Sequence, residues 1–93
     1  MKAHELPADI RREKKLLLDD VAARMGTARS HASDFEAGKG STTEQRIRKW
    51  AKAVGVPYAR AHRAIWRAVL RQCRARMREA QSRLTQPLGE NGA

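Results

Sequence analysis

The chain has 93 residues, and 20 Lys and Arg against 10 Asp and Glu leave a formal net charge of +10. That length allows one small domain with a thin core, which a partner subunit would reinforce. The positive charge predicts attraction to a polyanion, and we take nucleic acid as the partner class. The single cysteine, Cys73, excludes an internal disulfide and fits a reducing cytoplasm. The apolar runs are too short for a membrane span, and no hydrophobic signal segment follows Met1.

Three short helices are predicted in the amino-terminal part, where apolar residues recur at helical spacing. They are expected over residues 8–15, 18–25 and 28–37. Gly26 supplies a tight turn between the second and the third, and Gly38 supplies the left-handed cap that ends the third. The start of the third helix is polar. Two helices joined steeply, with a polar and exposed start to the second of them, form the geometry that inserts a helix into a DNA groove.

A fourth helix is predicted to begin after Thr43, its capping residue, and to end at Gly55. Its apolar residues recur at i, i+3, i+4 and i+7, which makes one amphipathic face. A fifth, long helix is expected over residues 57–84, where no glycine or proline follows Pro57. The expected core consists of Ile10, Leu16, Val21, Met25, Ala32, Phe35, Ile47, Trp50 and Val54.

Several short motifs carry the spacing of a known family. They are Leu16, Asp19-Asp20-Val21-Ala22, Met25-Gly26-Thr27, Arg29-Ser30, Ala32, Phe35-Glu36, Gly38-Lys39 and Ala51-x-x-Val54-Gly55-Val56. With them, residues 10–56 resemble the helix-turn-helix domain of the lambda-repressor/Cro (Xre) family of bacterial and phage transcription regulators. The resemblance implies an all-α fold, a five-helix domain with an extended C-terminal helix. Residues 1–56 are then the DNA-binding domain, and the helix at about 28–37 is the recognition helix in the major groove.

The resemblance also implies roles for particular residues. Base contacts are expected from Arg29, Ser30, Ser33 and Asp34. Arg29 would pair with guanine and Asp34 would accept from a cytosine amino group. Phosphate contacts are expected from His31, Lys39, Gly40, Thr43 and Arg46. Arg11 and Glu36 occupy the positions of a structural salt bridge between the first and third helices.

The sequence departs from the family pattern at three places. Leu17 and Leu18 stand where a capping Ser or Thr and a phosphate-binding polar residue are usual. Either the second helix starts differently, or these leucines pack against something outside the core, such as the last helix. Glu44 stands where an apolar residue is usual. The third helix is net acidic, so most of the positive charge for DNA has to come from elsewhere.

The long helix carries an apolar seam with heptad spacing, which predicts a dimerisation element. The expected interface residues are Ile65, Trp66, Val69, Leu70, Cys73, Met77 and Leu84. Beside the seam runs a row of arginines that would follow DNA phosphates or meet an acidic protein partner: Arg67, Arg71, Arg74 and Arg78. Like charges flanking the seam disfavour a parallel pairing of two copies. Residues 85–93 are expected to be a disordered tail.

These features favour a cytoplasmic transcriptional repressor that binds double-stranded DNA as a homodimer on an inverted repeat. An antitoxin-like or adaptor protein, whose last helix binds another protein, is the main alternative. A basic RNA-binding or nucleoid protein with little sequence preference is a third. An enzyme is not expected, because no nucleophile–base pair and no phosphate-cradling glycine loop is present. No cofactor and no metal are expected, since the three histidines lie far apart in the sequence.

Overall fold

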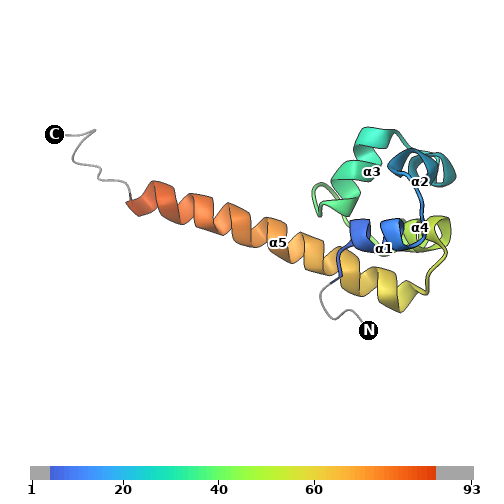
Figure 1. Cartoon of the computed structure of the whole chain (residues 1–93). Coiled ribbons are helices and arrows are strands. Elements are labelled where there is room, and N and C mark those ends of the chain that lie inside the picture. Colours follow the sequence, from blue (N-terminus) through green and yellow to red (C-terminus); the bar gives the residue numbers. More distant parts are fainter. Residues whose placement is uncertain (1–4, 86–93) are drawn as a thin grey trace.

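The computed structural model describes residues 5–85, which form five helices joined by short turns and loops (Figure 1). The helices are α1 (Pro7–Glu13), α2 (Leu18–Met25), α3 (Arg29–Glu36), α4 (Glu44–Val54) and α5 (Tyr58–Thr85). The all-α, five-helix prediction is confirmed. Within the described part of the chain, no helix is both long and apolar enough to cross a membrane. The tail expected over 85–93 lies, beyond Thr85, outside the described residues.

One apolar core joins all five helices. Every predicted core residue packs into it, although Leu16 and Met25 are only half-buried. Trp50 of α4 is completely buried and is the largest of these side chains. The prediction omitted several small residues that are buried too, among them Ala53 of α4 and Ala61 and Ala64 of α5.

The first half of α5 belongs to this core. Four of its residues are buried on one helix face, because their spacing follows the turns of the helix: Ala61, Ala64, Ile65 and Ala68. The expected domain boundary implied that the core ends at residue 56, but the core continues into α5. The expectation that Ile65 lies in a subunit interface is wrong, because its side chain is fully buried within its own chain and has no surface left to offer.

The corner after α3 packs unusually closely on α5. The backbone N–H groups of Gly38 and Lys39 donate to the carbonyls of Phe35 and Asp34, at 3.1 and 2.8 Å, which closes the end of α3. Gly38 has a φ of +79°, and a Cβ atom at this position would lie 2.5 Å from the carbonyl carbon and oxygen of Ala68. Only glycine permits both the left-handed backbone and this approach. The corner thereby holds α5 against α3.

Aspartates at the third position of α1 and α2 cap helices whose N-cap residue is a leucine. The backbone N–H of Leu6 donates to Asp9 and that of Leu17 donates to Asp20, each at 2.9 Å. The second helix therefore starts where the pattern predicted, with Leu17 exposed beside it. Leu18 lines a groove together with residues of α5, in agreement with the packing that the sequence suggested, whereas Leu17 is 69% exposed and does not show this packing.

The segment before α1 is tied to α5 by arginine. Arg60 donates to both Glu5 and Glu13, with the shortest N–O distance to each at 2.8 Å, and Arg67 donates to the Glu5 carbonyl, also at 2.8 Å. The hydrogen bonds from Arg60 to Glu5 and Glu13 raise the pKa of this guanidinium above its ordinary value, so it stays charged. These bonds leave Arg60 and Arg67 occupied within the domain.

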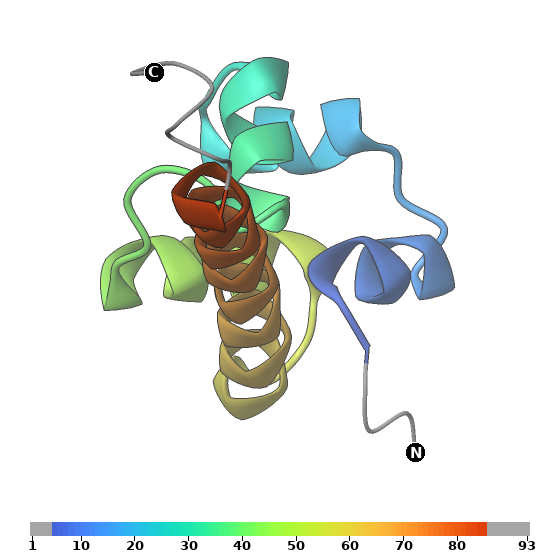
Figure 2. The ribbon, with the colours of Figure 1, turned by 90° about the vertical axis from the view of Figure 1, so that its left-hand side faces the viewer.

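Beyond residue 72, α5 leaves the domain as a free helix. All side chains described from Cys73 to Leu84 are exposed, and the described chain measures 57 Å along its longest axis against 30 and 23 Å across. Viewed nearly along α5 in Figure 2, α1 and α4 lie on opposite sides of this helix and α3 lies above it. The molecule thus consists of a small helical domain and a projecting arm.

Candidate nucleic-acid interface

A short turn on Gly26 joins α2 to α3. Gly26 adopts a left-handed φ of +69°, and the Thr27 N–H donates to the Ala22 carbonyl at 3.0 Å. The connection consists of Gly26, Thr27 and Ala28, and α3 begins at Arg29. This is the helix, tight turn and second helix that the sequence predicted, and it places α3 on the outside of the domain (Figure 1).

A buried polar cluster anchors the inner side of α3. The guanidinium Nε of Arg11 lies 3.0 Å from both carboxylate oxygens of Glu36, so the expected ion pair is present. The indole N–H of Trp50 also donates to Glu36, at 3.2 Å. Sequence reasoning missed this last bond, although a core tryptophan needs an acceptor for its N–H. Together these contacts fix α3 to α1 and α4.

The outer face of α3 is polar and exposed. Ser30 and Asp34 lie one turn apart at its centre, and Ser33 lies toward α5. Arg29 is exposed at the start of the helix, but its guanidinium pairs with Asp19 of α2 at 3.1 Å. Both side chains of this pair are about 70% exposed, so it contributes little to stability. All four expected base-contact residues therefore lie on the accessible side of α3.

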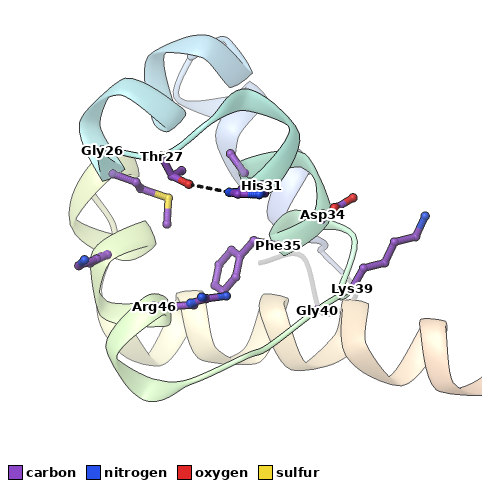
Figure 3. Close-up of a pocket in the computed structure, with 11 residues that line it drawn as sticks. Gly26, Thr27, His31, Asp34, Phe35, Lys39, Gly40 and Arg46 are labelled. Carbon is purple, nitrogen blue, oxygen red and sulfur yellow. Dashed lines mark hydrogen bonds between the residues drawn. The ribbon is translucent and has the colours of Figure 1, made fainter.

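Most of the expected phosphate-contact residues line one cleft of about 340 Å³ beside α3. Figure 3 shows His31 and Asp34 of α3 on one side of it and Arg46 of α4 on the other. Lys39 and Gly40 come from the loop between them. Within the cleft, the Thr27 hydroxyl and Nδ1 of His31 form a hydrogen bond of 3.4 Å.

The start of α4 adjoins the cleft. The Thr43 hydroxyl accepts from the Arg46 N–H at 3.2 Å, which confirms Thr43 as the cap. Glu44, which departs from the family pattern, is exposed and pairs with Arg48 at 2.8 Å. Lys49 also lines the cleft and was not predicted; its place one turn after Arg46 on α4 was the available signal.

The apolar seam of α5 lies on the face opposite its buried residues. Its large side chains are substantially exposed: Trp66 39%, Leu70 54%, Met77 66% and Leu84 79%. Cys73 is also exposed, and Val69 is half-buried at the edge of the domain. We call Trp66, Leu70, Cys73, Met77 and Leu84 the apolar stripe. A largely exposed apolar stripe of this length is typical of an interface.

A family model described as helix-turn-helix matches residues 8–60. The match covers more than half of the chain, from α1 to the first turn of α5, and includes the whole outer face of α3. The free half of α5 lies outside it. Comparisons with curated proteins and with solved structures gave no match.

Proposed function

The chain belongs to the helix-turn-helix family of the lambda-repressor/Cro (Xre) type, and on this premise we propose that it is a sequence-specific transcriptional repressor. Members of this family are DNA-binding regulators. The observation that carries the proposal is the polar outer face of α3, held rigidly by the buried bonds of Glu36 to Arg11 and Trp50. A recognition helix needs such support, because reading bases requires side chains placed to within a fraction of an ångström.

Base reading is assigned to the outer face of α3. In the major groove, Arg29 pairs with the O6 and N7 atoms of a guanine, and Asp34 accepts from a cytosine amino group. Ser30 and Ser33 contact the neighbouring base edges. Arg29 must first leave Asp19, which takes little free energy because the pair is exposed to water. The guanine contact therefore replaces a weak bond with a stronger, bidentate one.

Phosphate contacts are assigned to the cleft and the start of α4. His31, Lys39 and Arg46 surround it, with Lys49 as an added cation. The backbone N–H groups from Gly40 to Thr43 lead into the positive end of the α4 dipole, which favours an anion. These contacts orient the domain on the duplex without reading its sequence.

The repressor acts as a homodimer through the apolar stripe of α5. Two domains would then meet an inverted repeat whose half-sites lie about 34 Å apart, one turn of DNA. Arginines flank the stripe on both sides, for example Arg74 and Arg76, so two parallel copies would hold like charges together. An antiparallel or crossed packing avoids this repulsion.

The second candidate function is an antitoxin-like or adaptor protein. The same flanking arginines favour it, because an acidic helix of another protein would cover the apolar stripe without repulsion. Sedimentation separates the two candidates: the homodimer requires the isolated chain to dimerise, and the adaptor does not.

Selection from random duplexes, followed by footprinting, tests the DNA-binding proposal. We expect an inverted repeat to emerge. Arg29→Ala should reduce discrimination by about 1–3 kcal/mol at one base pair per half-site. Lys39→Ala should weaken all duplexes alike, since phosphates carry no sequence. Failure to enrich any site contradicts the proposed sequence-specific binding. An unchanged ranking of sites with Arg29→Ala contradicts the assignment of base contacts on α3.

A double substitution in the apolar stripe tests the dimer. Leu70→Glu with Met77→Glu should give a monomer with an unchanged helical content, because both side chains are exposed in the single chain. Its affinity for the two-site operator should fall far more than its affinity for one half-site. A wild-type chain that sediments as a monomer at operator-binding concentrations would overturn the dimer.

A further inference from the structure

We propose that α5 from Arg71 onward is a second DNA-contacting element, in which Arg71, at the root of the arm, and Arg78, within the arm, bind backbone phosphates beside the groove that α3 occupies. This inference rests on the proposed binding of duplex DNA. It assigns to DNA a part of the chain that the family match does not reach.

The arm begins directly beside the recognition helix. Ser33 of α3 and Ala37, which follows this helix, share one groove with Arg71, Gln72 and Ala75 of α5, and the volume of the groove is about 460 Å³. The close approach of Gly38 to α5 keeps the two helices together at this point. In both views of the ribbon, α3 lies next to the middle of α5 (Figures 1 and 2). We therefore expect DNA on the outer face of α3 to reach the first exposed turns of α5.

The face of the arm that continues this groove is hydrophilic. Because side chains three and four residues apart share a helix face, the buried face of α5 continues outward through small and polar residues. These are Gln72, Ala75, Glu79 and Ser82. Arg71 and Arg78 line one edge of this strip, while Arg76 and Arg83 line the other. The apolar stripe lies on the opposite side of the helix, so a dimer formed through it leaves the strip open to DNA.

Charge supports a polyanion on this strip. α5 contains eight arginines and one glutamate, and that glutamate lies 3.8 Å from Arg83. Within residues 5–85, no carboxylate forms an ion pair with Arg71 or Arg78. The outer face of α3, by contrast, offers Arg29 and Asp34, whose charges cancel. The arm thus supplies the positive charge that the recognition helix lacks.

The reach of the arm suits several phosphates. The residues from 72 to 84 span roughly 18 Å at about 1.5 Å per residue, and duplex DNA carries one charge per about 1.7 Å of its axis. Arg71 and Arg78 are seven residues, or about two turns, apart on the same edge, a separation of roughly 10 Å. Both can therefore engage one stretch of backbone.

Two matched double variants test the inference. Arg71→Gln with Arg78→Gln removes two charges from the edge of the strip. Arg63→Gln with Arg74→Gln removes two charges from exposed positions of the same helix that lie nearer the apolar stripe. The affinity for a selected duplex and for a random duplex is measured over a range of salt concentrations, with sedimentation of each variant as the control for its oligomeric state.

We expect the first variant to reduce the slope of log K against log salt by close to 0.9 for each phosphate that is no longer neutralised, on both duplexes. The second variant should change the wild-type slope by less than about half of that amount. Hydroxyl-radical footprints should show weaker protection of the backbone flanking the α3 site only with the first variant. Equal slopes for the two variants overturn the inference while the proposed function stands. A wild-type chain that binds no duplex overturns both.

Discussion

Replacing Gly38 by alanine should destabilise the fold more than any other glycine-to-alanine change in the described chain. The positive φ of +79° costs a residue with a Cβ about 1–2 kcal/mol. The new Cβ would also lie 2.5 Å from backbone atoms of Ala68, which cannot rotate away as a side chain could. Forcing α5 outward costs about 1–3 kcal/mol more, by comparison with overpacked cores. The free energy of unfolding should therefore fall by about 2–5 kcal/mol.

Gly26 and Gly55 provide matched controls. Both have a left-handed φ, of +69° and +85°, but a Cβ at either position would have no neighbour within 4 Å. Gly26→Ala and Gly55→Ala should therefore show only the backbone cost of about 1–2 kcal/mol. Urea unfolding followed by circular dichroism measures all three. If Gly38→Ala is no more destabilising than the controls, α5 does not pack against this corner as described, and the place of the arm beside α3 is wrong.

Three further substitutions test the core, the buried cluster and one strained turn. Phe35→Ala should lower the free energy of unfolding by about 3–5 kcal/mol, because the ring is buried; a decrease below about 1 kcal/mol in urea would contradict its place in the core. Glu36→Gln should lower the free energy of unfolding by about 3 kcal/mol, because the Arg11 charge loses its partner. Thermal melting at neutral pH measures this effect, and an unchanged melting temperature would show that the pair does not stabilise the fold. Lys15→Gly should raise the melting temperature by about 4–8 °C, since Lys15 has a φ of +57° and relief of this strain gains about 1 kcal/mol; a lower melting temperature would mean that the backbone entropy of glycine outweighs it.

The positions of the helices could be predicted because each rests on local signals. Gly26, Gly38 and Gly55 all adopt a left-handed backbone at the end of a helix, as expected from their place in the pattern. Thr43 caps α4 through its own hydroxyl. Such signals act within one or two turns of the chain, so they can be read without knowledge of the tertiary packing.

The role of each face of α5 could not be predicted in the same way. The sequence contains two apolar faces, one of large residues around Trp66 and Leu70 and one built largely of alanines. Periodicity cannot tell which of them packs inward. The structure buries the alanine face because small side chains let α5 approach the corner at Gly38, and Ile65 falls on this side. Ile65 was therefore assigned to the subunit interface, although it belongs to the core of its own chain.

Contacts between side chains that are distant in the sequence could be predicted only in part. The bond between Arg11 and Glu36 followed from the family resemblance, because it joins two positions that the pattern itself defines. The pairing of Arg29 with Asp19 did not, since it depends on the angle at which α2 and α3 meet. The cleft that gathers His31 with Arg46 likewise depends on how the loop returns α4 toward α3.

Because α5 is one uninterrupted helix, the arm has a fixed length and a fixed rotation relative to the domain. No glycine or proline separates its buried first half from its free second half, so the helical rotation set inside the domain is carried to its tip. Inserting one residue after position 72 would turn the distal arm by about 100° and lengthen it by about 1.5 Å, whereas inserting seven would nearly restore its orientation. The direction in which the apolar stripe faces would therefore change in discrete steps as this helix becomes longer or shorter, and in the proposed dimer the spacing of the two DNA sites would change with it.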